Sequence, residues 1–462
     1  MVRTRAAISP TGYPHIGTIY QALFDYVFAH RHKGKFIVRI EDTDKERTVA
    51  DAEEKVFMAL DWFGLIEDES VRKEGPYKPY RQSDRLDIYK KYADDLINKN
   101  KAYYCFCSKE RLDKLRQELQ KKDKVPMYDK HCLKLTKEEI KQKLAKNESY
   151  VIRLNVPNNI QIKIKDELRG EITFESNSVD DQVLMKSDGY PTYFLAVVVD
   201  DHLMEITHMV RGEEWLTSSA KIVLLYEYFG WKKPIFVHTP IIRNPDRSKF
   251  SKRQGHTSVS WYQEQGFLPE VILNYLSLMG WSHPDGKEIF SLDEFIKLFD
   301  FKDIKPIGPV FDLIKLEWMN GIYLRNMENE DLRFKIYEFY KKQLPENIVE
   351  KTTPLIKERI KKLSDYLPLC EFFFKAPEKF EVDLASKKDF FRKVHAELEK
   401  VTDWKALTIG DSLVNLAKKL EIKNSQFFMD MRIVITGKKI SPPLNESMEI
   451  LGKEECLKRL SI

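Results

Sequence analysis

The sequence predicts an α/β fold that carries an α+β insertion and is followed by an all-helical region. Through residues 1–105, short apolar runs alternate with helix-like segments, as in a doubly wound sheet. Residues 106–186 are rich in Lys and Glu and hold isolated extended segments, which indicates an insertion. We expect the sheet to resume within 187–325, whereas the pattern in 326–462 is helical almost throughout.

The first element is expected to be a buried strand that passes through a turn into a helix. Residues 2–8 form a short apolar run, residues 9–14 are dense in turn formers, and apolar residues recur at helical spacing from Ile16 onward. His15 and Gly17 therefore fall at a helix N-terminus, where free N–H groups and the helix dipole favour a phosphate. Gly17 would let the ligand approach closely. The alternative is a histidine that only completes the turn.

Later strands are expected from further apolar runs. Residues 36–40 are the second buried-strand candidate and lead directly into Glu41, Asp42, Thr43 and Asp44. Additional extended segments are expected at 150–156, 162–164, 192–199 and 235–237.

A polar, turn-rich stretch contains Lys249-Phe250-Ser251-Lys252-Arg253, which with the segment around His15 and Gly17 is a candidate half of an ATP site. Nucleotidyl transfer builds negative charge on the α-phosphate and on the leaving pyrophosphate. Lysines that close over these groups stabilise the transition state more than the ground state, and Lys249 and Lys252 suit that role. An isolated loop of this kind is otherwise a solvated basic turn.

Length, composition and charge limit the classes of protein to which the chain can belong. The chain has 462 residues, which predicts about three domains, and its net charge of +5 is compatible with a nucleic-acid partner. No apolar run approaches the ~20 residues that span a bilayer, and no signal-peptide pattern opens the chain. Five cysteines, three of them clustered, favour reduced thiols over a disulfide framework. We expect a cytoplasmic protein without a membrane partner.

Taken together, these segments resemble one family. Residues 5–12 with His15-Ile16-Gly17 are similar to the opening of bacterial glutamyl-tRNA synthetases, which are class I aminoacyl-tRNA synthetases with a Rossmann-like catalytic domain. The resemblance runs from the first residues into the C-terminal helices and is densest before residue 330. Further segments that carry it are Arg39-Ile40-Glu41-Asp42-Thr43-Asp44, Tyr190-Pro191-Thr192-Tyr193, Val199-Asp200-Asp201-His202, Arg211-Gly212-Glu213-Glu214-Trp215 and Phe311-Asp312-Leu313-Ile314-Lys315-Leu316.

The resemblance implies a two-step ligase reaction. Glutamate and ATP would form glutamyl-adenylate and pyrophosphate with Mg²⁺ on the phosphates, and the glutamyl group would pass to the 3′ end of tRNA(Glu). Catalysis would be positioning and charge stabilisation. A monomer is the family expectation. The residues implied at the ATP site are His15, Gly17, Glu214, Trp215, Lys249, Ser251 and Lys252, of which His15, Gly17, Lys249 and Lys252 would be catalytic.

The amino-acid pocket calls for arginine, whose planar fork matches a carboxylate. Arg5 and Arg211 stand at the family positions that contact the γ-carboxylate. Ser9 and Tyr193 would add hydroxyl contacts, and Glu41 would accept the α-ammonium group. The alternative for Arg5 is a strand-end arginine paired with Glu41.

Two regions are expected to contact tRNA. The resemblance places Thr43 and Asp44 at the tRNA 3′ end, although an acidic pair here could also hold a metal or cap a helix. The helical segments that carry Lys357, Arg359, Lys361 and Lys362 would form the basic face of an anticodon-binding region, with Arg359 separating the glutamate anticodon from the glutamine anticodon. Such a charge run is otherwise a solvated face.

The clustered cysteines leave two alternatives open. Cys105, Cys107 and Cys132 with Tyr128 resemble the Cys-x-Cys and Tyr-x-x-x-Cys zinc ligands of related glutamyl-transferring proteins, and His131 is another candidate ligand. Without metal, the same residues would form a small hydrophobic knuckle of reduced thiols.

Other classes of protein share some of these sequence features. Glutaminyl-tRNA synthetase shares the signatures, but its anticodon-binding part is typically a β-barrel. The tRNA-modifying paralogue lacks an anticodon domain, and small cytidylyltransferases are much shorter. A catalytically inactive tRNA-binding protein would not be expected to keep both ATP segments complete.

Overall fold

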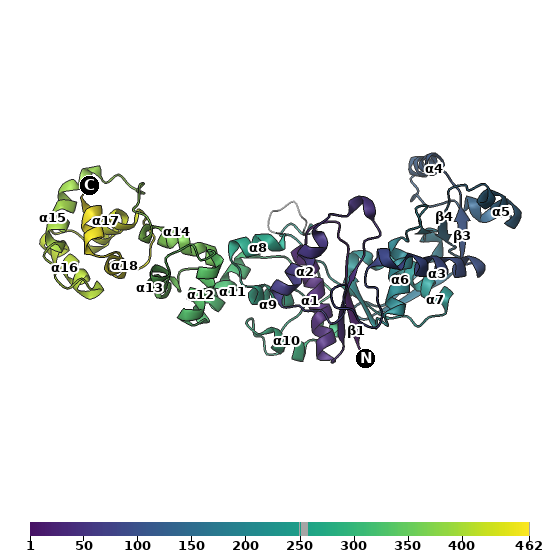
Figure 1. The fold of residues 1–462 in the computed structure, drawn as a ribbon, viewed down its shortest axis with the longest axis horizontal. Coiled ribbons are helices and arrows are strands. Elements are labelled where there is room, and N and C mark those ends of the chain that lie inside the picture. Colours follow the sequence, from purple (N-terminus) through teal and green to yellow (C-terminus); the bar gives the residue numbers. More distant parts are fainter. Residues whose placement is uncertain (249, 251–256, 462) are drawn as a thin grey trace. The chain divides into compact units, whose positions relative to one another are not determined.

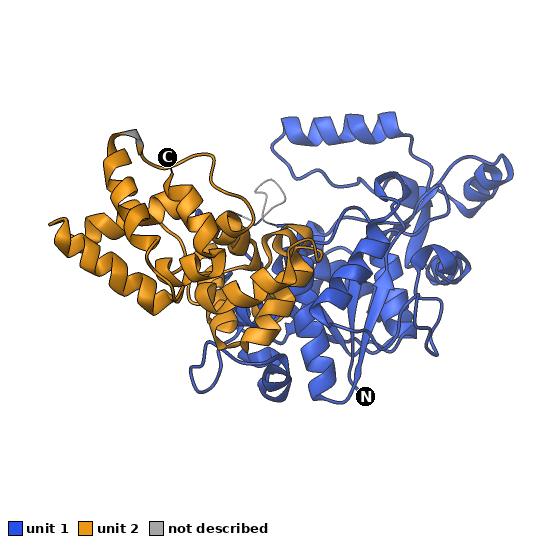
Figure 2. Cartoon of the chain, turned by 60° about the vertical axis from the view of Figure 1, so that its left-hand side comes forward, with its two compact units in different colours: residues 1–259, 273–311 blue, residues 260–272, 312–462 orange. Residues whose placement is uncertain are grey.

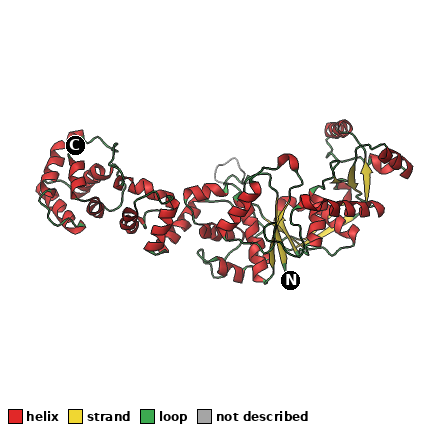
Figure 3. Ribbon diagram, in the orientation of Figure 1, coloured by secondary structure: helices red, strands yellow, loops and turns green. Residues whose placement is uncertain are grey.

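The computed structural model describes residues 1–248, 250 and 257–461, which form two compact units (Figure 2). Unit 1 comprises residues 1–259 and 273–311, and unit 2 comprises 260–272 and 312–462. Every strand of the described chain belongs to unit 1, whereas the regular structure of unit 2 is helical (Figure 3). The expected α/β region followed by a helical region is confirmed.

In the described residues of unit 1, nine strands form three sheets. The largest has the order β6-β5-β9-β8, a second has the order β3-β4-β7, and β1 pairs with β2 in parallel. The strands are β1 (Arg3–Ile8), β2 (Lys35–Ile40), β3 (Ala102–Cys105), β4 (Val151–Leu154), β5 (Gln161–Asp166), β6 (Gly170–Glu175), β7 (Val183–Met185), β8 (His208–Gly212) and β9 (Ile235–Thr239).

The N-terminal strand, turn and helix form as the sequence predicts. Strand β1 leads through residues 9–14 into helix α1 (Ile16–Arg31), which begins directly after His15. The apolar residues at helical spacing, among them Ile19, Leu23 and Val27, are buried. Burial of this stripe fixes the helix start beside the end of the strand.

Strands β1 and β8 lie side by side, although they are far apart in the sequence. The amide of Thr207, just before β8, donates to the carbonyl of Arg3 at 3.0 Å, and the amide of Arg3 donates to the Thr207 hydroxyl at 2.9 Å. Strand β8 pairs in parallel with β9, and the register sets Arg211 opposite His238. The carboxyl ends of β1, β8 and β9 therefore meet at one edge, where ligands bind in open α/β sheets.

Part of the predicted insertion belongs to the largest sheet. Strands β5 and β6 form an antiparallel hairpin, and Asp166 at the end of β5 pairs with Phe236 of β9. The expected extended segments at 150–156 and 162–164 are confirmed as β4 and β5. The predicted insertion thus contacts β9 through Asp166.

The strand predicted at 192–199 is wrong, because these residues lie in helix α6 (Tyr193–Leu203). Residues 195–199 are all buried. A helix that is buried on every side is apolar on every side, so the periodicity that marks a helix is lost, and a run of three valines then resembles a buried strand. The strand predicted at 235–237 is confirmed as part of β9.

Helices cover unit 1 and extend into unit 2 (Figure 1). No helix among the described residues is long and apolar enough to cross a membrane. The first helices are α1 (Ile16–Arg31), α2 (Ala52–Phe63), α3 (Leu86–Asn98), α4 (Lys109–Lys121), α5 (Lys137–Ala145), α6 (Tyr193–Leu203), α7 (Ser219–Phe229), α8 (Val259–Gln265), α9 (Pro269–Gly280) and α10 (Leu292–Leu298).

Unit 2 contains a separate apolar core built from its last helices. Buried residues from Leu384 to Leu460 form one continuous cluster, with Phe391, Leu413 and Val434 among its members. The helices are α11 (Leu313–Asn326), α12 (Asn329–Phe339), α13 (Glu346–Ile356), α14 (Tyr366–Cys370), α15 (Lys388–Leu398), α16 (Ala406–Lys419), α17 (Asn424–Thr436), α18 (Leu444–Leu451) and α19 (Lys453–Leu460).

The basic segment predicted as helical, from Lys357 to Lys362, is instead a turn between α13 and α14. Helix α13 ends at Ile356, which is fully buried, and Ile360 is buried as well. These two apolar residues fix the turn from inside, and the side chain of Arg359 between them is exposed.

Candidate functional site

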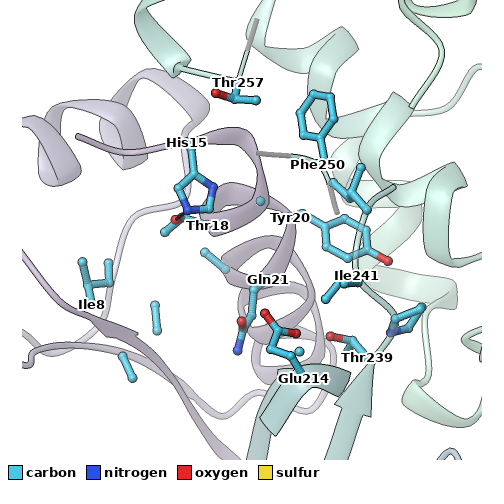
Figure 4. A pocket seen from close by; sticks show the side chains of 17 residues that line it. Ile8, His15, Thr18, Tyr20, Gln21, Glu214, Thr239, Ile241, Phe250 and Thr257 are labelled. Carbon is cyan, nitrogen blue, oxygen red and sulfur yellow. Dashed lines mark hydrogen bonds between the residues drawn. The ribbon is translucent and has the colours of Figure 1, made fainter. Parts of the chain in front are cut away.

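A cavity of about 410 Å³ opens where β1, β8 and β9 end beside the start of α1 (Figure 4). His15, Thr18 and Gln21 of the α1 region line it, together with Glu214 and Thr239 (Figure 4). The remaining lining residues are Ala6, Ala7, Ile8, Gly17, Tyr20, Ala22, Gly212, Pro240, Ile241, Ile242, Phe250 and Thr257.

The helix N-terminus at this cavity is shaped by a histidine and a glycine. His15 precedes the first turn of α1 in extended conformation, and its Nε2 lies 3.4 Å from the Thr18 hydroxyl. A Cβ at Gly17 would lie only 3.1 Å from the His15 ring, so glycine lets the ring fold over the first turn. The amide of Ile16 donates to the Thr257 carbonyl at 2.9 Å, and the amides of Thr18 and Ile19 donate to the His15 carbonyl. The His15 ring and the positive end of the helix dipole are therefore what this end of α1 offers to an anionic phosphate.

Arg5 belongs to a buried ion cluster on the other side of β1. Its Nε donates to Asp201 at 3.0 Å, and its Nη1 donates to the Val210 carbonyl at 3.0 Å. Arg39 donates to the same Asp201 oxygen at 2.7 Å and to Glu41 at 2.9 Å. The expected alternative of an Arg5–Glu41 pair is therefore wrong, because Arg39 takes Glu41 and Arg5 takes Asp201.

Charge in this cluster is balanced by burial and pairing. Burial opposes ionisation of Arg5, but Asp201 together with Tyr193 and Asp25 outweighs that cost, and the pKa of the guanidinium is raised. Burial raises the pKa of Glu41, against the opposing effect of Arg39. The cluster is completed by Arg85, whose Nε donates to Asp200 at 2.8 Å.

Arg211 lies in a different environment, although it is buried like Arg5. Its three nitrogens donate to neutral groups: Nε to His238 Nε2 at 3.0 Å, Nη2 to Ser219 Oγ at 2.6 Å and Nη1 to the Tyr193 hydroxyl at 3.3 Å. Within the described chain, no carboxylate lies within ion-pair distance of Arg211. His238 Nδ1 lies 2.6 Å from Asp166 Oδ2.

The other predicted pocket residues are distributed around these two arginines. Tyr193 begins α6, and its ring lies 4.6 Å from that of the half-exposed Trp215. Glu214 lines the cavity, and Ser9 is exposed just after β1. Arg5 and Tyr193 are close enough to interact electrostatically. The structure thus brings Arg5, Glu41, Tyr193 and Arg211 to one region, whereas Lys249, Ser251 and Lys252 lie outside the described residues.

The acidic pair after β2 does not form a metal cluster within the described chain. Asp42 accepts hydrogen bonds from the amide and hydroxyl of Ser83 at 2.8 and 2.6 Å. Asp44 forms an ion pair with Arg47, which lowers the pKa of its carboxyl group. Asp44 precedes a short 3₁₀ turn without capping it through its side chain. The Thr43 carbonyl accepts from Lys186 at 2.9 Å.

Three thiols meet beside β3 in the insertion. The sulfurs of Cys105, Cys107 and Cys132 all lie within 4.8 Å of one another, and Cys107 and Cys132 are 3.5 Å apart. The hydroxyl of Tyr128 lies 3.3 Å from both Cys105 and Cys107. His131 is exposed and is not part of this cluster. The hydrogen bond from Cys132 lowers the pKa of Cys105.

Arg359, the predicted anticodon residue, is exposed in unit 2 on the turn after α13. It lies close enough to Arg432 to lower the pKa of that guanidinium further, although burial is the larger cause. Arg432 donates to the Ser441 hydroxyl at 2.6 Å and to the Pro442 carbonyl at 2.9 Å.

Three positioning residues were not predicted from the sequence. Asp201 stood inside a recognised segment without an assigned role, and His238 directly follows the predicted strand at 235–237. Asp166 lies in the hairpin that was assigned to the insertion. In the sequence, the only indication of these residues is a polar side chain near the end of an apolar strand. The pairing of β5, β8 and β9 is what shows that these side chains meet.

Comparison with known proteins gives two family matches that together cover most of the chain. Residues 1–318 match the model described as the catalytic domain of class I tRNA synthetases (E and Q). Residues 330–462 match an anticodon binding domain.

Individual relatives are similar over nearly their whole length. A protein of Acidothermus cellulolyticus named glutamate–tRNA ligase is 44% identical over 478 residues, covering 99% of this chain and 94% of that protein. One of the same name from Pseudomonas aeruginosa is 43% identical over 467 residues, with the same coverage. A crystal structure of a glutamate tRNA ligase from Elizabethkingia meningosepticum in complex with its amino acid has a TM-score of 0.89 and 36% identity, and it covers 99% of this chain and 98% of that one.

Proposed function

Because the chain belongs to the family of class I tRNA synthetases for glutamate and glutamine, we propose that it is a glutamate–tRNA ligase. The α-carboxylate of L-glutamate attacks the α-phosphate of ATP and expels pyrophosphate. The terminal ribose hydroxyl of tRNA(Glu) then attacks the carbonyl of the adenylate and releases AMP. The observation that carries the choice of glutamate is Arg211, a buried cation whose hydrogen-bond acceptors are all neutral.

The start of α1 supports ATP binding. His15 lines the cavity at the positive end of the helix dipole and suits the phosphates, while Gly17 keeps the His15 ring in place. Glu214 and Trp215 would flank the adenosine, and Lys249, Ser251 and Lys252 would close over the phosphates. Mg²⁺ would reduce the charge of the phosphates when it enters with ATP, and Glu214 is the carboxylate of the described cavity wall.

The two arginines support recognition of a carboxylate. Arg211 would bind the γ-carboxylate through its planar fork, with Arg5 and the hydroxyls of Tyr193 and Ser9 beside it. Glu41 would accept the α-ammonium group. Glutamine has no charge to offer to Arg211, so its binding would leave a buried cation uncompensated, which costs more than a lost neutral hydrogen bond.

The reaction is tested by attachment of labelled glutamate to total bacterial tRNA in the presence of ATP. The wild type is expected to attach glutamate, and His15→Ala and Lys252→Ala are expected to lose most of that activity without losing their fold. Attachment of glutamine instead of glutamate would show that the chain is a glutaminyl-tRNA synthetase. No attachment of either amino acid would contradict the ligase function altogether.

We also propose that Thr43 and Asp44 contact the tRNA 3′ end and that Arg359 contacts the anticodon. The Lys45 and Lys186 ammonium groups lie 4.0 and 5.5 Å from the Tyr190 ring centroid, which gives the region of Thr43 a basic surface. Arg359→Ala is expected to change the relative charging of tRNA(Glu) and tRNA(Gln). Unchanged rates with both tRNAs would exclude this role for Arg359.

Zinc is proposed for the cysteine cluster, because three thiol sulfurs and a phenol oxygen already surround one point. Zinc prefers four such donors in a tetrahedron, and closed sites of this kind are structural. Metal analysis of protein purified without added zinc is expected to find about one equivalent in the wild type and in Cys370→Ser, which changes a buried thiol elsewhere. Cys132→Ser is expected to lose it, and a zinc content near zero in the wild type would end the proposal.

A monomer in the cytoplasm is proposed as well. All five cysteines are free thiols, as in a reducing compartment. Light scattering coupled to size exclusion is expected to give a mass near the 54.6 kDa of the chain, and a mass twice as large would contradict the monomer.

A further inference from the structure

The side chain of Arg211 is held by partners on three elements. Its Nε donates to His238 on β9 at 3.0 Å, its Nη2 donates to Ser219 at the start of α7 at 2.6 Å, and its Nη1 donates to Tyr193 at the start of α6 at 3.3 Å. His238 and Ser219 are fully buried. Three directed bonds leave the guanidinium one orientation, and the bond to His238 is the one made by Nε at the base of the fork.

The proton of His238 is fixed by Asp166. A carboxylate only accepts, so the 2.6 Å contact between Asp166 Oδ2 and His238 Nδ1 requires the proton on Nδ1. Nε2 is then the acceptor that Arg211 needs. Burial lowers the pKa of His238 and, together with Arg211, outweighs the raising effect of Asp166, which favours the neutral ring.

Asp166 is itself held rigidly at the end of β5. Its Oδ1 accepts from the amides of Leu168 and Arg169 at 3.0 and 3.1 Å, and its Oδ2 also accepts from the amide of His238 at 3.1 Å. The hairpin of β5 and β6 therefore orients the ring of His238 through Asp166, and His238 in turn orients the guanidinium of Arg211. This contact joins the predicted insertion to the amino-acid pocket.

The His238 ring also separates Arg211 from the carboxylate of Asp166. A carboxylate placed directly on Arg211 would neutralise the charge that the substrate has to compensate. Arg5 shows the contrast, because its cluster holds three arginines and three carboxylates: Arg5, Arg39, Arg85, Asp200, Asp201 and Glu41. Of the two pocket arginines, Arg211 is the one whose charge is left uncompensated by the described chain.

We propose that His238 and Asp166 are positioning residues for glutamate selection, which hold the Arg211 fork toward the substrate carboxylate while leaving its charge uncompensated. This inference rests on the proposed function and adds to it two residues that touch neither substrate. Their effect is expected in the recognition of glutamate and not in the binding of ATP.

Substitution of His238 by asparagine or by glutamine distinguishes its hydrogen bond to Asp166 from its hydrogen bond to Arg211, because the two amide side chains differ in length. His238→Asn keeps a donor near Asp166 but loses the acceptor for Arg211, whereas His238→Gln places its Oε1 near the position of Nε2 and keeps that acceptor. We expect His238→Asn to raise the KM for glutamate by about 10- to 100-fold, as for the loss of one buried hydrogen bond to a charged group. We expect His238→Gln to stay within about threefold of the wild type, and the KM for ATP to stay within about twofold in both.

His208→Gln is the matched control, since it changes another histidine on the same strand pair, three residues before Arg211. It is expected to leave both KM values unchanged. Should His238→Asn not fold, Asp166→Asn carries the same prediction, because an amide that donates to Nδ1 would move the ring proton to Nε2, against Arg211.

The outcomes separate this inference from the proposed function. If the wild type does not attach glutamate to tRNA, the proposed function fails before any variant is measured. If the wild type is active and folded His238→Asn keeps the KM for glutamate, the positioning role is excluded. Equal increases in the KM for glutamate and for ATP, or equal effects of the Asn and Gln variants, would show a merely structural histidine and would also overturn the inference.

Discussion

Arg5 and Arg211 show how two buried arginines of one pocket carry different tasks. Arg5 shares Asp201 with Arg39 and is part of the frame that joins β1, β2 and α6. Arg211 contacts neutral groups and faces the region where the substrate side chain is proposed to lie. We therefore expect Arg5 to stabilise the fold through its pairing and propose that Arg211 provides the selectivity.

Asp201 is expected to matter mainly for stability. Asp201→Asn removes a charge that both Arg5 and Arg39 contact in a buried site, and breaking such a pair costs about 3–5 kcal/mol of unfolding free energy. Asp61→Asn is the control, because Asp61 pairs with Arg72 at the surface and such pairs contribute less than about 1 kcal/mol. Denaturant unfolding measures both, and equal losses would contradict the central position of Asp201.

Gly17 is expected to be needed for the shape of the ATP site. In Gly17→Ala, the new methyl group would press on the His15 ring at 3.1 Å and displace it, so we expect the KM for ATP to rise about tenfold or more. Gly321→Ala in α11 is the control, because only the flexible end of Arg325 lies near its Cβ position. Unchanged ATP kinetics in Gly17→Ala would show that the ring position is not critical.

Site residues were predictable only where they lie in contiguous motifs. His15 and Gly17 follow from the turn at the start of a helix, and that placement is confirmed. The partners of Arg5 and Arg211 were missed or misassigned, because Asp201 and His238 are 196 and 27 residues away in sequence. Burial decides which charges pair, and a strand register rather than a local pattern decides which residues are buried together.

At the scale of elements, the sequence predicted several strands and helix α1, but it did not predict the apolar helix α6. Strands β1, β2, β5 and β9 follow from short apolar runs flanked by turns. Helix α6 was mistaken for a strand because burial on all sides removes the polar stripe that gives a surface helix its period. The turn after α13 was mistaken for helix because its lysines and arginine are compatible with a helix. The burial of Ile356 and Ile360, which sets the end of the helix, is not visible in the sequence.

The packing of β8 against α1 predicts a contribution to acid sensitivity. The ring of His208 packs edge-to-face against Phe28, near His32 and Asp300, and burial lowers its pKa to about 4. Since the unfolded value is about 6.5, the neutral form contributes stability that is complete above pH ~6.5 and is lost as the pH falls toward ~4.

We therefore expect the unfolding free energy of the wild type to fall by roughly 2–3 kcal/mol more than that of His208→Gln over this pH range. Urea unfolding of both proteins at matched pH values measures the difference. A constant difference across the range would show that His208 does not titrate with the proposed shift.

At the scale of the whole molecule, the last helices form a core of their own. Within the described chain, the buried members of this cluster lie between Leu384 and Leu460, and the half-buried Val382 packs against them. A fragment of residues 381–462 is expected to be helical and to unfold cooperatively, because it keeps that core together with the contact between Glu381 and Gly437. Circular dichroism and thermal unfolding test this, and a fragment without a cooperative transition would contradict it.

The most direct test of glutamate–tRNA ligase function and its chemical basis is the ratio of kcat/KM for glutamate and glutamine, measured by charging of purified tRNA(Glu) in the wild type and in Arg211→Gln. The wild type is expected to favour glutamate by at least about 10⁴-fold, as for a site built around a buried charge. Arg211→Gln is expected to lose most of that preference through a higher KM for glutamate. A wild type that charges both amino acids equally, or a variant that keeps the full preference, would contradict the account.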